Sequence, residues 1–187
     1  AYQGSSHVVD FALHSARGPN FTVLVAQSNG SLANHVPGPV RTYIGTIANL
    51  PGAMASAVRR ANGAVCYHVL FEDGAEWINN GGSTTLRTDA SWTAAYPSFV
   101  TGAGGAGSNV WAAEVGVDVP FSQYAIDNDV DRALEMVEHS VNTVNLMYLR
   151  DACVTHRIGR VVVRANLAVD PYAGLPATGD LLNAISQ

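Results

Sequence analysis

Lysine is absent from this sequence of 187 residues, and all ten of its basic residues are arginines. Aspartate and glutamate together number 15, which gives a net charge of −5 at pH 7. No basic cluster is larger than the pair Arg59-Arg60. Binding to nucleic acid requires a concentrated positive surface that neutralises phosphates. The sequence therefore argues against a nucleic-acid partner.

A long apolar run is also missing, because no stretch approaches the roughly 20 residues of a membrane-spanning helix. The N-terminus has no basic segment followed by an apolar one, the pattern that directs secretion. The chain starts at Ala1 rather than at methionine, which we interpret as removal of a signal peptide or as the start of a fragment. Both interpretations suit an exported protein. We therefore expect a secreted or cell-surface location without a membrane span.

Cysteine is scarce, since only Cys66 and Cys153 occur. Two cysteines are too few for a disulfide scaffold, and their spacing is not the C-x-x-C of a zinc or redox site. We expect two packed thiols, and the sequence leaves open a bridge between them. Cys66 lies in a predicted strand rather than in an exposed loop, which favours a packed thiol.

Apolar residues make up 48% of the chain and charged residues 13%, which is enough to bury a core. Residues 1–100 read as short strands separated by turn residues, which predicts an antiparallel β-rich domain, either a sandwich or barrel-like. Asn62-Gly63 and Asp73-Gly74 predict two-residue hairpins with type I′ turns. The predicted strands span residues 8–14, 21–27, 40–47, 54–59, 64–71, 76–78 and 84–88.

Residues 101–109 are rich in glycine and predict a flexible linker. After it, residues 110–187 read as strand, long helix and strand, so the fold class is α+β. The predicted strands are 110–119 and 153–164, and Asp127 or Asn128 is the expected helix cap. A sheet of only two strands would leave both edges open, so we interpret this unit as incomplete. The helix is indicated by apolar residues at alternating steps of four and three: Val130, Leu134, Val137, Val141, Val144 and Tyr148.

Several short motifs of the second unit, taken in order, resemble the opening of the catalytic domain in bacterial reprolysin-like (adamalysin-like) metzincins, which are zinc metalloproteases. The motifs are Ala113-Glu-Val-Gly-Val-Asp118, the helix from Val137 to Tyr148, Arg150-Asp151, Ile158-Gly-Arg-Val-Val-Val-Arg164 and Asp170-Pro-Tyr172. The resemblance covers residues 110–187, and residues 1–100 are similar to the β-rich propeptide that precedes such domains.

The zinc-binding motif of that family, His-Glu-x-x-His-x-x-Gly-x-x-His, is absent from the chain. The resemblance therefore implies zinc and metalloendopeptidase activity for a parent protein, and no catalytic residue, cofactor or zinc ligand here. In relatives a calcium ion can lie near the start of the first strand, which makes Glu114 or Asp118 candidate ligands, although no further oxygen ligands are identified. We interpret Glu138 and His139 as part of the solvated face of the helix.

The leading functional hypothesis is the propeptide and opening catalytic segment of an exported metalloprotease precursor, whose partner is the rest of its own catalytic domain. The alternative is a non-enzymatic subunit of an extracellular filament or surface assembly, whose partners are other copies of itself; open strand edges would suit strand exchange. A third possibility, a carbohydrate- or small-ligand-binding module using Trp77, Trp92 or Trp111, has no motif behind it, because aromatic residues in strands usually belong to the core.

Overall fold

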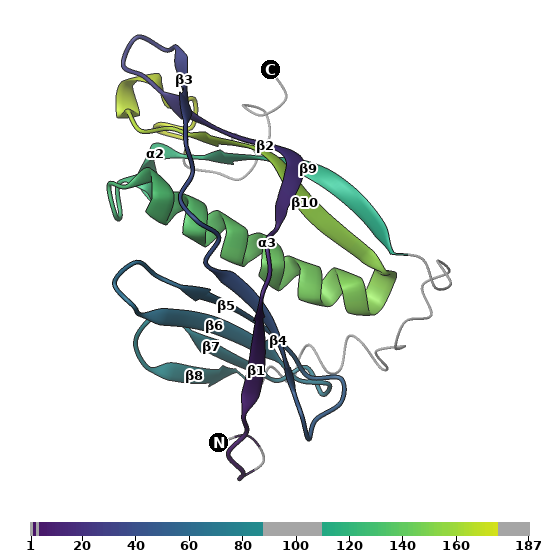
Figure 1. Ribbon diagram of the computed structural model, residues 1–187. Helices are drawn as coiled ribbons and strands as arrows, with labels where there is room; N and C mark the ends of the chain where they lie inside the picture. Colours follow the sequence, from purple (N-terminus) through teal and green to yellow (C-terminus); the bar gives the residue numbers. More distant parts are fainter. Residues whose placement is uncertain (1, 3, 88–109, 176–187) are drawn as a thin grey trace.

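The computed structural model describes residue 2, residues 4–87 and residues 110–175, and it places one long helix between two β-sheets (Figure 1). This arrangement confirms the α+β class. No helix of the described residues combines the length and apolar character needed to span a membrane. The glycine-rich tract, Trp92 and the residues after 175 lie outside the described residues.

The first sheet has six antiparallel strands in the order β1-β4-β5-β6-β7-β8, all from the predicted β-rich part of the chain. Its apolar core lies on the face away from the helix, because Ala55 is in that core whereas its neighbour Ser56 contacts the helix. Tyr2 closes this core by stacking on Phe71 at 3.7 Å. The strands are β1 (Val9–Leu13), β4 (Thr42–Ile47), β5 (Met54–Arg59), β6 (Val65–Leu70), β7 (Glu76–Asn79) and β8 (Thr84–Arg87).

The second sheet has four strands in the order β3-β2-β10-β9, and it joins the two predicted units. Strands β9 (Trp111–Val119) and β10 (Val154–Val163) are parallel, as expected from the intervening helix. The expected two-stranded sheet is wrong, because β2 (Arg17–Ala26) pairs with β10 in parallel and β3 (Leu32–His35) extends the sheet. The predicted ranges 1–100 and 110–187 therefore share one sheet.

Three hairpins repeat one turn, and it differs from the type I′ turn predicted for two of them, at Asn62-Gly63 and Asp73-Gly74. In each, only the glycine has positive φ, with values of +82° at Gly30, +86° at Gly63 and +82° at Gly74. Arg60 N–H donates to the Ala64 carbonyl, which leaves a three-residue loop of a type I turn followed by a glycine bulge. The preceding Asn or Asp side chain accepts from the second backbone N–H after it in all three turns, so an Asx interaction replaces the second left-handed residue.

Helix α3 (Val130–Ala152) begins one residue later than the predicted caps allow. The cap is Asp129, whose carboxylate accepts from the N–H groups of Asp131 and Arg132. Cys153 ends the helix in a left-handed conformation with φ 54°. A short helix α2 (Phe121–Tyr124) precedes α3, and a 3-10 turn η1 (Leu167–Val169) follows β10. The apolar stripe of α3 packs against the second sheet between Val130 and Val141, around Ile158, whereas Val144 is 37% and Tyr148 48% exposed.

Replacement of Asp129 by alanine is expected to lower the free energy of unfolding by about 1 kcal/mol, because two helix N–H groups lose their acceptor. Urea denaturation followed by circular dichroism measures the change. Asp127→Ala is the matched control, since this nearby exposed aspartate forms only a surface ion pair with Arg132. Equal losses in the two variants would contradict the assignment of Asp129 as the cap.

Candidate functional site: the polar stripe of helix α3

A second stripe on α3 follows the apolar stripe one residue later and keeps the same four-three spacing. Its members are polar, yet three of them are buried: Glu138 is 1% exposed, Asn142 0% and Asn145 2%. The stripe faces two segments of the first half that cross between the sheets, residues 14–16 and 36–41. We call it the polar stripe; it consists of Asp131, Glu135, Glu138, Asn142 and Asn145.

Glu138 forms a buried ion pair with Arg17, with 2.5 Å between Arg17 Nε and Glu138 Oε1. A second arginine nitrogen, Nη1, donates to the Gly38 carbonyl at 2.9 Å. Burial raises the pKa of Glu138 above its usual value, and the hydrogen bond and charge of Arg17 offset only part of that rise. The interpretation of Glu138 as a solvated residue is therefore wrong, because the strands of the first half cover this side of the helix.

Asp131 holds the connection between β3 and β4. Its Oδ1 accepts from Gly38 N–H at 3.1 Å and lies 3.0 Å from His35 Nε2. Partial burial raises the pKa of Asp131, but the hydrogen bonds from His35 and Gly38, together with nearby positive charge, bring it below its usual value. The start of α3 is thereby fixed to residues 35–38.

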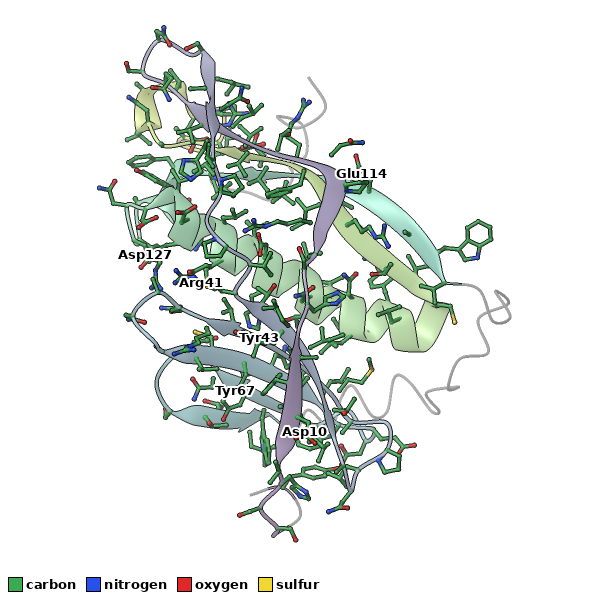
Figure 2. The ribbon with its side chains drawn as sticks, viewed as in Figure 1. Asp10, Arg41, Tyr43, Tyr67, Glu114 and Asp127 are labelled. Carbon is green, nitrogen blue, oxygen red and sulfur yellow. The ribbon has the colours of Figure 1, made fainter. Side chains whose placement is uncertain are left out.

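Two more arginines surround Glu135. Arg41 Nη1 lies 3.5 Å and Arg132 Nη1 3.4 Å from its carboxylate, and Arg132 also reaches Asp127. Figure 2 shows Arg41 and Asp127 on the side where α3 begins. Burial raises the pKa of Glu135, and the nearby arginines offset only part of this rise. The cleft between these groups has a volume of about 130 Å³, well below the roughly 300–1,000 Å³ of typical ligand pockets.

Toward the C-terminal end of α3, the side chains of the polar stripe bind backbone groups rather than charged side chains. Asn145 Nδ2 donates to the His156 carbonyl at 2.9 Å, and its Oδ1 accepts from the His156 N–H at 2.6 Å. Asn142 Nδ2 donates to the His14 carbonyl at 3.4 Å, and Thr42 donates to the same carbonyl at 2.6 Å. The polar stripe therefore has a structural role, because each side chain fixes a crossing segment or a strand end to the helix.

A neighbouring cluster joins α3 to the six-stranded sheet. Thr143 and Ser56 share a hydrogen bond of 2.7 Å, and His68 lies 3.3 Å from Glu76. Serine, histidine and carboxylate thus occupy β5, β6 and β7, the residue types of a hydrolase triad. Ser56 is fully buried beneath α3, so its hydroxyl cannot reach a substrate.

His139 belongs to the same cluster and is not on a solvated face. The interpretation of His139 as a solvated residue of the helix is therefore also wrong. Its Nδ1 atom is buried and has no hydrogen-bond partner among the described residues. Burial, followed by the positive charges of His68 and Arg60, lowers the pKa of His139 to about 4. The imidazole is therefore neutral at pH 7.

The structure does not bring the two candidate calcium ligands together. Asp118 accepts a bidentate interaction from Arg164, with contacts of 2.9 Å to Nε and 2.5 Å to Nη2. Glu114 is exposed on β9 (Figure 2), and its carboxylate covers Gly159 so closely that no room is left for a β-carbon there. Four residues of strand separate the two by about 13 Å. A calcium site at either residue stays a prediction.

The remaining residues singled out from sequence have varied surroundings. Cys66 is buried on β6, as expected of a packed thiol, and both cysteines are free. Trp77 belongs to the core and meets the Phe71 ring edge-on at 4.9 Å. Trp111 is 63% exposed, so the expectation that strand aromatics are core residues fails there.

Sequence reasoning missed the polar stripe, although its four-three spacing was a readable signal. No group of three or more histidine, cysteine, aspartate or glutamate side chains suited to a metal occurs among residues 4–87 and 110–175. No protein-family model matches the sequence, and no curated protein matches it either. The function must therefore be argued from the residues and their geometry.

Proposed function

We propose that the chain is the propeptide and the opening catalytic segment of an exported zinc metalloprotease precursor. The observation that carries the proposal is the arrangement of the stretches that resemble metzincins. Residues 113–118 lie on β9, residues 137–148 on α3 and residues 158–164 at the end of β10, and together they form one parallel β-α-β unit. In this proposal the zinc ligands and the general base belong to a His-Glu-x-x-His segment that follows Gln187.

The first half then serves as a folding partner for the start of the catalytic domain. Its strand β2 completes the sheet beside β10, and its arginine Arg17 neutralises the buried Glu138. A β-α-β unit without these contacts would expose the edge of β10 and the apolar core residues that β2 covers. No catalytic step is assigned to this chain, because its described residues provide no zinc ligand set.

Intact mass measurement and peptide mapping of the protein from its source test the proposal. We expect peptides that continue past Gln187 into a His-Glu-x-x-His segment, and zinc in the longer species by elemental analysis. A chelator should then abolish peptidase activity of the matured protein. A homogeneous mature species that ends at Gln187 and carries no zinc would refute the proposal.

A second candidate function is a subunit of an extracellular assembly, and exposed apolar strand edges favour it. Within the described residues β9 pairs only with β10, and β1 pairs only with β4. Trp111 is 63% and Leu13 63% exposed on these two strands. Exposed apolar edge strands are templates for pairing with another chain. Large, regular particles in light scattering and electron microscopy would favour this candidate, whereas a monomer at micromolar concentration would exclude it.

A further inference from the structure

The two halves of the chain are interleaved rather than adjacent. Strand β2 lies inside the second sheet, between β3 and β10, and its register with β10 runs from Arg17 opposite Ile158 to Val25 opposite Val163. Ile158 N–H also donates to the Ala16 carbonyl at 2.7 Å. The sheet therefore depends on backbone hydrogen bonds between residues 16–26 and residues 154–163.

Within residues 4–87 the chain crosses from one sheet to the other twice, and both crossings run past α3 (Figure 1). Residues 14–16 are held by His14, whose carbonyl accepts from Asn142. Residues 36–41 are held through Gly38, which contacts both Asp131 and Arg17. Helix α3 is thus enclosed by segments of the first half on the side of the polar stripe.

Each half would expose an unpaired strand edge and part of a shared apolar core if it stood alone. Without residues 4–87, Glu138 loses Arg17, and β10 loses its neighbour β2. Without residues 110–175, Arg17 loses its carboxylate, and β2 and β3 remain as an isolated hairpin, which is marginally stable in water. The core that Val23 shares with Leu134 and Ile158 would also face water in both cases, which is unfavourable. The interface therefore stabilises both halves.

We infer that residues 4–87 and residues 110–175 are non-covalent partners, which remain bound to each other after the chain is cut between them. The interaction surface on the first half is strand β2 with Arg17 and the helix-facing side of β5. The surface on the second half is the edge of β10 with the polar stripe. This inference does not depend on the protease proposal. If that proposal also holds, cleavage between residues 88 and 109 does not release the first half, and a separate dissociation step is required.

The test uses the full chain with a recognition site for a sequence-specific protease inserted within residues 101–108. After complete cleavage, the sample is passed through a size-exclusion column at micromolar concentration and analysed by native mass spectrometry. We expect one peak that contains both pieces, with the circular dichroism spectrum of the uncut chain. Two separate peaks, or loss of structure on cleavage, would overturn the inference. Neither outcome bears on whether a zinc-binding segment follows Gln187, so the two proposals fail independently.

A variant pair identifies the surface. In the cut chain, Arg17→Met is expected to raise the dissociation constant of the pieces about 100-fold or more, because it leaves Glu138 buried without its partner. Arg59→Met is the matched control, because Arg59 is exposed at the end of β5, and it should change the constant less than about threefold.

A milder variant tests the same interaction surface if Arg17→Met does not fold before cleavage. Thr143→Val removes the hydrogen bond to the buried Ser56, together with one to the His139 carbonyl within the helix, and we expect it to raise the dissociation constant about tenfold. Unchanged dissociation in both Arg17→Met and Thr143→Val would refute the assigned surface.

Discussion

Replacement of Glu138 by leucine is expected to lower the free energy of unfolding by about 3–5 kcal/mol. The physical reason is the Arg17 guanidinium, whose side chain is only 17% exposed and loses its carboxylate at 2.5 Å. A loss of this size is a large part of the roughly 5–15 kcal/mol that stabilises an ordinary domain. Urea denaturation with tryptophan fluorescence and circular dichroism measures the change.

The double variant Arg17→Met/Glu138→Leu separates the ion pair from the packing at this position. A buried ion pair that is replaced on both sides by apolar residues costs little, since both charges are removed from the interior together. We therefore expect the double variant to recover most of the stability lost in Glu138→Leu. A single change that costs less than about 1 kcal/mol, or a double variant as unstable as the single one, would show that the pair is not the principal link across α3.

Acidification from pH 7 to pH 5 is expected to destabilise the fold through His139 by about 2 kcal/mol. The pKa of this imidazole is lowered from 6.5 to about 4, chiefly by burial and then by the charges of His68 and Arg60. Between about pH 6.5 and pH 4 this imidazole carries a proton in the unfolded chain but not in the folded chain. Stability is therefore full above about pH 6.5 and falls as the pH drops toward 4.

Other groups with shifted pKa values also contribute to the change in stability between pH 7 and pH 5. Burial also lowers the pKa of His14, which adds to the loss in acid. The raised pKa values of Glu135 and Glu138 act in the opposite direction, because the folded state binds these protons more tightly. His139→Met isolates the single residue, and its stability between pH 7 and pH 5 should change about 2 kcal/mol less than that of the parent chain. An unchanged pH profile in this variant would assign the acid sensitivity to other groups.

The sequence predicted the repeating elements of the fold well, since alternating apolar residues and turn residues mark most strands of the first sheet. Strand β5 was expected over residues 54–59 and is found there. Strand β3 was missed, because Leu-Ala-Asn-His offers neither alternation nor β-branched residues. The type I′ turns were also predicted wrongly, because an Asn-Gly pair fits equally well into a three-residue loop in which only glycine needs positive φ.

The candidate site could not be assembled from sequence because its partners are distant. Glu138 and Arg17 are 121 positions apart, and Asp131 and Gly38 are 93 apart. An acidic residue next to an apolar stripe is ordinarily solvated, so a local pattern cannot reveal that a second layer covers it. The spacing of Glu138, Asn142 and Asn145 does carry information, since two stripes with the same period indicate a helix that is covered on more than one side.

The position of β2 inside the second sheet has a consequence for the order in which the chain folds. Strands β4 to β8 of the six-stranded sheet form consecutive hairpins, so each can pair soon after its neighbour leaves the ribosome. Strand β2 is made early, but its parallel neighbour β10 is among the last elements of the described chain. Contacts between such distant residues form slowly, because a long loop must close first. The hairpin of β2 and β3 must therefore wait through most of synthesis with one edge exposed, and aggregation during expression should depend on how quickly β10 arrives.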